Sequence, residues 1–229
     1  MSTFALIPGA GGHGGYWDAL VPELEDRGHR AIAVDIQEDD PALGLDQYAD
    51  IVEAAIGDDP APVLVAQSMG GFTAPMVAAR RPVAMIVLLN AMIPRPGERI
   101  ADWWENTGSG EARRRADEDA GRDPEFDLEA HFLHDVPEAW RARLLAEPQR
   151  EVADKAWTDR CRFERWPDVP IKVLAGRDDR FFPVEFQRRV AAERLGRATE
   201  EITGGHLVAL SNAAGLAQQL DEYAAALAG

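Results

Sequence analysis

Serine, aspartate and histidine are the residue types that together make a serine nucleophile, and each occurs in this chain shortly after an apolar segment. They are Ser68, Asp179 and His206. A serine hydroxyl is a weak nucleophile until a base removes its proton, and neutral imidazole does this near pH 7. A carboxylate beside the imidazole fixes its tautomer and stabilises the imidazolium that forms. The three residues therefore predict nucleophilic attack on a carbonyl carbon.

The stretch from Leu64 to Gly71 favours a sharp strand-to-helix turn around Ser68. Such a turn strains the serine backbone, so the residues two before and two after it must be small, and here they are Ala66 and Gly70. The N–H of Met69 would then lie at the start of the helix, where it can stabilise negative charge. The pattern A-x-S-x-G departs from G-x-S-x-G by one residue. A buried strand followed by serine as an ordinary helix cap is the alternative interpretation.

Strands and helices alternate before residue 91 and again after residue 168, as apolar periodicity and turn residues indicate. The predicted strands are 3–7, 30–34, 62–66, 83–89, 169–175 and 198–202, and the predicted helices are 17–24, 45–56, 69–80, 183–195 and 211–227. This order indicates parallel β-α-β units with right-handed crossovers. We expect an α/β fold with a parallel sheet of about six strands flanked by helices. The carboxyl ends of the strands would then gather the three catalytic candidates at one edge.

Residues 92–168 contain no convincing strand and predict a helical cap inserted into a core made of residues 1–91 and 169–229. The segment is rich in large rings, which either pack the cap or roof an apolar pocket, and both roles stay open. Trp103 and Trp104 follow most closely on the fourth strand and are candidate pocket walls. The charged run at 113–119 is most simply a solvated helix face.

The order Ser, Asp, His, with a helical insertion between Ser and Asp, resembles the α/β-hydrolase superfamily over essentially the whole chain. The short cap and the glycine-rich first loop are most similar to its esterase and hydroxynitrile lyase branch. The resemblance implies that Ser68 is the nucleophile and His206 the general base. Asp179 matches the family's acid through the loop pattern G-x-x-D-x-x-x-P, and Asp178 is the alternative. Some members carry the acid after the preceding strand, but Asn90 stands there and cannot hold the charge.

The same resemblance implies an oxyanion hole built from the backbone N–H groups of Met69 and Ala10, the latter in a glycine-rich loop after the first strand. Pro8 stands where the family usually has a histidine. Further along the loop, Gly11, His13 and Tyr16 are candidate pocket residues, although His13 and Tyr16 could equally be exposed loop residues. A phosphate-binding loop is disfavoured because no G-K-[ST] follows.

Net charge, cysteine content and histidine spacing restrict the partners, the cellular compartment and the metal sites that we expect. A net charge of −16 argues against nucleic acid and anionic membranes as partners. Cys161 is the only cysteine, which fits a reducing cytoplasm, and no leader or membrane span is evident. His131 and His134 could be drawn as a metal pair, but no third histidine or cysteine has ligand-like spacing, so a structural role is favoured.

We therefore expect a cytoplasmic enzyme that cleaves a small, largely apolar carboxylic ester through an acyl-enzyme, with no metal or organic cofactor. Its partner would be a small-molecule substrate, and the chain could be a monomer or a homodimer. The alternatives are a hydroxynitrile lyase or a C–C bond hydrolase that uses the same triad. A ligand receptor with residual hydrolase activity is a further alternative from another functional class.

Overall fold

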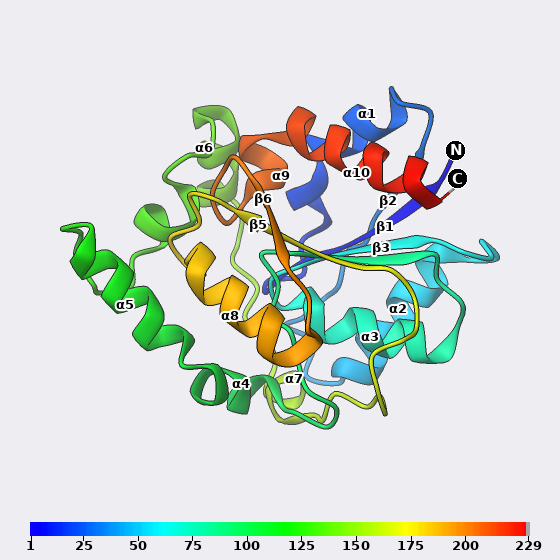
Figure 1. Ribbon diagram of the computed structural model, residues 1–229, viewed down its shortest axis with the longest axis horizontal. Coiled ribbons are helices and arrows are strands. Elements are labelled where there is room, and N and C mark those ends of the chain that lie inside the picture. The colour runs from blue at the N-terminus through cyan, green and yellow to red at the C-terminus, as the bar shows by residue number, and fades with distance from the viewer. Residues whose placement is uncertain (228–229) are drawn as a thin grey trace.

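Six parallel strands form one sheet in the computed structural model of the chain, which describes residues 1–227 (Figure 1). They are β1 (Thr3–Ile7), β2 (Arg30–Ala33), β3 (Val63–Gln67), β4 (Met85–Leu89), β5 (Ile171–Gly176) and β6 (Thr199–Ile202), in the order β2-β1-β3-β4-β5-β6. The two central strands β3 and β4 are buried along their whole length, as expected of a sheet covered on both faces. The predicted parallel sheet of six strands is confirmed, with strand ends shifted by at most two residues.

Helices cover both faces of the sheet and divide the core into two apolar clusters. One face carries the short helices η1 (Gly14–Trp17), α1 (Leu20–Glu25) and α9 (Val208–Ser211) and the longer α10 (Ala213–Leu227), and the other carries α2 (Leu45–Ile56), α3 (Gly70–Arg80) and α8 (Val184–Leu195). Successive side chains of β1 alternate between the clusters: Phe4 and Leu6 face the first set, and Ala5 and Ile7 the second. This close packing fixes the strand ends from which the site is built.

The insertion forms α4 (Ile100–Thr107), α5 (Ser109–Asp119), the π-helical turn η2 (Glu129–Leu133), α6 (Glu138–Ala146) and α7 (Asp154–Thr158). In Figure 1, α5 and α6 lie at the left, away from the two chain termini, and α4 and α7 lie along the lower edge. Ile100 and Trp103 from α4 and Ala156 from α7 belong to the same apolar cluster as α2 and α3, whereas α6 has no buried residue. Both ends of the insertion therefore share the core of the sheet, and Leu133 and Val136 from its middle belong to the other apolar cluster. Within residues 1–227, no helix is both long enough and apolar enough to cross a bilayer.

The charged run on α5 is buried on one side, so the expectation of a wholly solvated face is wrong. Asp117 is fully buried and meets Arg113 Nη1 at 3.2 Å, Arg122 Nε at 2.9 Å and His131 Nε2 at 3.0 Å. Burial alone would raise the pKa of Asp117, but hydrogen bonds from His131 and Arg122 hold this pKa below its usual range. A buried carboxylate is tolerated only with such hydrogen-bonding or charged partners. One of them, His131, comes from η2, and the apolar periodicity of the sequence did not predict this contact.

Candidate active site

Ser68 stands at the predicted turn between β3 and α3, in a backbone conformation that L-residues rarely adopt. Its φ is 48°, and its N–H donates a hydrogen bond to Leu89 O at 3.2 Å. A Cβ atom added at Gly70 would lie 2.6 Å from Pro8 O, so only glycine fits there. Close packing around the turn therefore holds Ser68 in place and explains why a glycine stands two residues after it.

Asp179 and His206 meet at the ends of β5 and β6, where Asp179 Oδ2 lies 2.9 Å from His206 Nδ1. The other carboxylate oxygen accepts the N–H groups of Phe181 at 2.8 Å and Phe182 at 2.9 Å. Asp178, the alternative, is exposed and its nearest donor is the N–H of Gly204 at 3.4 Å. The structure thus brings Asp179, and not Asp178, to the imidazole.

His206 is fully buried, and its Nε2 has no hydrogen-bond partner among residues 1–227. Three aromatic rings enclose the imidazole: Phe132, Phe181 and Phe182, with ring centroids 4.7, 5.1 and 5.3 Å from that of His206. Leu207, the next residue, lines the same cavity as Ser68. No hydrogen bond joins Ser68 Oγ to His206 Nε2 in the described chain, and in ligand-free hydrolases this bond is often long until substrate binds.

Asn90 is a residue of the site that the sequence argument considered only as an unsuitable acid. It is fully buried, with a φ of 45°, and its Nδ2 donates to Gly205 O at 3.0 Å and His206 O at 3.1 Å. Its Oδ1 accepts Gly176 N–H at 2.6 Å and Gln187 Nε2 at 3.2 Å. The amide therefore joins the end of β4 to the end of β5 and to the loop that carries the imidazole.

Gln187 on α8 is a second residue that sequence reasoning missed. Its Nε2 lies 3.2 Å from Asp179 Oδ2, 3.2 Å from Asn90 Oδ1 and 2.7 Å from Phe182 O. All three neighbours are acceptors, which assigns the amide nitrogen to this position. The side chain thus donates to Asp179 Oδ2, the same oxygen that contacts the imidazole of His206.

The two predicted oxyanion donors, Ala10 and Met69, line one cavity together with Ser68. Neither backbone N–H donates a hydrogen bond to a residue within 1–227. The loop that carries Ala10 is held by Glu38, whose Oε2 accepts Gly11 N–H at 2.7 Å. Two N–H groups without protein acceptors beside a serine hydroxyl form an arrangement that can stabilise a tetrahedral oxyanion.

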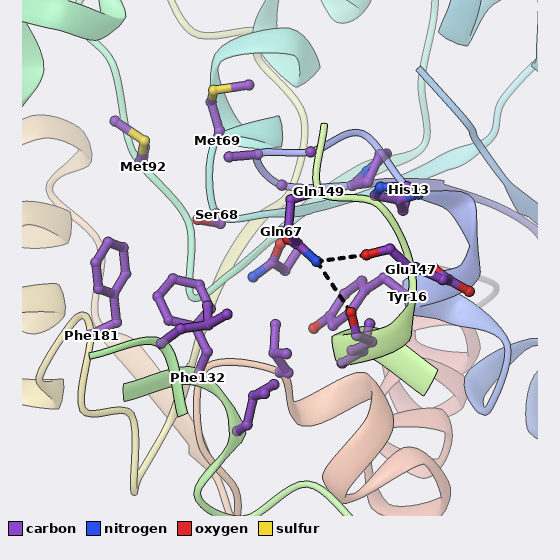
Figure 2. A pocket seen from close by; sticks show the side chains of 18 of the residues that line it. His13, Tyr16, Gln67, Ser68, Met69, Met92, Phe132, Glu147, Gln149 and Phe181 are labelled. Carbon is purple, nitrogen blue, oxygen red and sulfur yellow. Dashed lines mark hydrogen bonds between the residues drawn. The ribbon is translucent and has the colours of Figure 1, made fainter. Parts of the chain in front are cut away.

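The cavity has a volume of about 250 Å³ and is mainly apolar. In Figure 2, Ser68 lies between Phe132 and Phe181 on one side and His13 and Tyr16 on the other. The other lining side chains come mostly from the insertion and include Met92, Trp104, Leu128, Leu133, Leu144, Leu145, Glu147, Gln149 and Trp157. Gln149 donates through Nε2 to Leu144 O at 3.1 Å, which fixes the loop over the cavity.

Four of the five predicted pocket residues line this cavity: Gly11, His13, Tyr16 and Trp104. Trp103 does not, and its prediction as a pocket wall is wrong. Its ring is fully buried, its Nε1 donates to Ile93 O at 3.1 Å, and it packs on Phe182 and Phe186. Adjacent helix residues point about 100° apart, so only one of two neighbouring tryptophans can face the site.

The two histidines of the insertion do not converge. His131 uses both ring nitrogens, Nε2 toward Asp117 and Nδ1 toward Asp127 O at 2.7 Å. His134 instead lies beside Gly205, and burial lowers its pKa. Positions i and i+3 do not share a face here because η2 is π-helical. Among residues 1–227, no cluster of three or more histidine, cysteine or acidic side chains is placed to hold a metal.

Cys161 is also absent from the cavity lining. It is buried, its Sγ donates to Phe72 O at 3.1 Å, and burial raises its pKa above the ordinary value. A thiol in such surroundings stays protonated and is a poor nucleophile. Ser68 is therefore the better candidate for nucleophilic chemistry.

Comparisons with known proteins show what the whole chain is similar to. A family model described as the alpha/beta hydrolase family matches residues 4–219. A pyrethroid hydrolase from Sphingobium wenxiniae is 27% identical over 249 aligned residues, covering 98% of this chain and 88% of that protein. The solved structure of polyneuridine aldehyde esterase gives a TM-score of 0.78 at 21% identity, covering 98% of this chain and 99% of that one. A methylesterase from Arabidopsis gives 0.76 at 18% identity, with coverage of 98% and 99%.

Proposed function

Because this chain belongs to the alpha/beta hydrolase family, we propose that it hydrolyses a small, largely apolar carboxylic ester through an acyl-enzyme on Ser68. The observation that carries the proposal is the 2.9 Å contact between Asp179 and His206. Ser68, with its strained backbone, immediately precedes α3 and lines one cavity with Ala10 and Met69, whose N–H groups have no protein acceptor among residues 1–227. Nucleophile, base, acid and oxyanion donors are all supplied by the sheet and its loops.

In the proposed reaction, Ser68 Oγ attacks the ester carbonyl carbon while its proton passes to His206 Nε2. The negative charge that forms on the carbonyl oxygen is stabilised by the N–H groups of Ala10 and Met69. The imidazolium, held by Asp179, then gives its proton to the departing alcohol, and an acyl-enzyme remains. A water molecule loses a proton to His206 and attacks the acyl carbon. The bond to Ser68 Oγ then breaks, His206 returns its proton to Oγ, and the carboxylic acid is released.

The walls of the cavity support the choice of substrate. Phe132, Phe181 and Trp104 offer apolar surface close to Ser68, and Glu147 is the one ionisable carboxylate in the lining. An uncharged, apolar group gains by burial here, by about 0.8 kcal/mol for each methylene. Polyneuridine aldehyde esterase and the methylesterase are esterases by name, and the pyrethroid hydrolase is a hydrolase by name, which supports an ester as the bond that is cleaved.

The test is turnover of p-nitrophenyl esters with acyl chains of graded length by the wild type and by Ser68→Ala. The variant should retain the fold, because alanine fits the turn, and should lose about 10³-fold or more in kcat. Thr73→Ala, which removes a buried hydroxyl from the following helix α3, is the matched control and should keep most of the activity. Equal turnover by Ser68→Ala would refute the proposal. Cyanohydrin cleavage without ester turnover would indicate lyase chemistry instead.

A further inference from the structure

One buried carboxyl group near the site has no part in the reaction described above. Glu38 follows β2, is only 1% exposed, and lies beneath the loop that carries Ala10. Burying a carboxyl group costs free energy unless it forms hydrogen bonds, so a residue of this type at such a position needs an explanation. Its partner in the fold is the backbone N–H of Gly11, at 2.7 Å.

The segment after β2 holds the glycine-rich loop at three successive points. Glu38 accepts the N–H of Gly11, the N–H of Ile36 donates to Gly12 O at 2.8 Å, and Asp35 Oδ1 accepts Gly14 N–H at 2.9 Å. The contact of Glu38 with Gly11 N–H is adjacent to Ala10, whereas the contact of Asp35 with Gly14 N–H is four residues away from Ala10. Glu38 is therefore the side chain best placed to fix the orientation of the proposed oxyanion donor.

The loop needs such a side chain because its glycines allow many backbone conformations. Gly11 and Gly12 both have positive φ, 95° and 66°, and glycine gives up this freedom only at an entropic cost. Pro8, at the start of the loop, has no N–H to donate. The hydrogen bond to Gly11 N–H sets the plane of the peptide between Ala10 and Gly11, and hence limits where the preceding N–H can point.

We propose that Glu38 is a positioning residue: its carboxyl group holds Gly11 N–H inward so that Ala10 N–H faces the ester carbonyl oxygen. Glu38 touches no substrate and acts only through the loop. The inference rests on the proposed esterase function, because it assigns Glu38 to the oxyanion hole of that reaction.

The charge of Glu38 gives the proposal a second consequence. Burial raises the pKa of Glu38 to about 8, against the opposing effects of Gly11 N–H and of Arg150. The charged and titratable groups near it are Arg150 from the insertion and Tyr48 from α2, and Asp35 from its own segment is paired with Arg150. At pH 7 the carboxyl group is mostly neutral, and above pH 8 it becomes an anion beneath a loop that must stabilise another anion. Turnover should therefore fall as the pH rises through about 8.

The experiment compares Glu38→Met, which fills the site but cannot accept a hydrogen bond, with Glu38→Gln, which keeps an acceptor. Asp35→Ala is the matched control, since it removes the other carboxylate that binds this loop. We measure kcat and KM on a p-nitrophenyl ester, and the affinity for an alkyl trifluoromethyl ketone, which Ser68 would convert into a tetrahedral oxyanion. Melting temperature is recorded for each variant.

The expected result is a loss of about 10- to 100-fold in kcat for Glu38→Met, with little change in KM and an equal loss of affinity for the ketone. Glu38→Gln should keep at least about a third of the wild-type kcat and lose the decline above pH 8, and Asp35→Ala should stay close to wild type.

Three results would overturn the inference: unchanged kcat in a folded Glu38→Met, an equal loss in Asp35→Ala, or a decline above pH 8 that persists in Glu38→Gln. The last arm needs only the conservative variant, so it decides the question even if Glu38→Met does not fold. Wild-type protein without Ser68-dependent turnover would refute the proposed function as well. Normal wild-type turnover with any of these three results would refute only the role of Glu38.

Discussion

The side-chain amide of Asn90 lies 3.1 Å from the carbonyl oxygen of His206, a residue 116 positions later in the chain. It also donates to Gly205 O and accepts the N–H of Gly176, so one buried amide joins the end of β5 to the loop that carries the imidazole. The loop carrying His206 is thus anchored by backbone contacts that do not involve the imidazole itself.

Asn90→Asp should destabilise the fold, because a carboxylate in place of the amide nitrogen would face two carbonyl oxygens instead of donating to them. We expect a loss of about 2 kcal/mol or more in the free energy of unfolding, measured with urea at pH 7. Asn212→Asp is the control, because Asn212 Nδ2 also donates to a carbonyl, Thr203 O at 2.8 Å, but in an exposed setting. Equal losses in the two variants would show that Asn90 has no special role.

Asp179→Asn should reduce turnover far more than Asp178→Asn, because only Asp179 contacts the imidazole. Loss of the carboxylate favours the wrong imidazole tautomer and leaves the imidazolium without its counter-charge, and the precedent is a drop of about 10⁴-fold in kcat. Steady-state kinetics on one p-nitrophenyl ester measures both. Similar losses, or the reverse order, would assign the acid to Asp178.

Trp104→Ala should change substrate specificity and Trp103→Ala should change stability, although the two residues are adjacent. Trp104 lines the cavity, so its loss should raise kcat/KM for long acyl esters relative to short ones by about 10-fold. Trp103 is buried in the core, so its loss should cost about 3–5 kcal/mol of stability with little change in that ratio. Kinetic ratios and urea unfolding of both variants check this, and a specificity change confined to Trp103→Ala would contradict it.

Glu38 should make the fold less stable as the pH rises from about 5 to about 8. In the unfolded chain its carboxyl group ionises near the ordinary value of about 4.3, whereas in the fold its pKa is about 8. Between these values the folded state holds one proton more, so the free energy of unfolding falls with pH, by at most about 1.4 kcal/mol per pH unit.

Glu38→Gln removes this proton, so its stability relative to wild type should increase between pH 5.5 and pH 8.5. Urea unfolding of both proteins at the two pH values measures the difference, and the ionisation of other groups cancels. A constant difference would mean that Glu38 ionises normally in the fold.

Local sequence patterns were enough to predict the sheet and the serine turn, because apolar strands and small flanking residues act over a few positions. The choice of Asp179 over Asp178 came from the resemblance to the family's loop pattern G-x-x-D-x-x-x-P, and only Asp179 contacts His206. The roles of Glu38 and Asn90 were not predicted because their partners are 27 and more than 80 residues away. Trp103 was misplaced because sequence alone does not say which side of α4 meets the core.

Because Ser68 has a left-handed backbone conformation, a substitution there can raise thermal stability and abolish reactivity at the same time. An L-residue in that conformation costs about 1–2 kcal/mol, which glycine would not incur. Selection for heat resistance alone would thus favour Ser68→Gly, which removes the hydroxyl on which the proposed reaction depends. A directed-evolution campaign on this scaffold therefore has to score turnover in every round, because improved survival at high temperature and loss of the enzyme can arise from the same mutation.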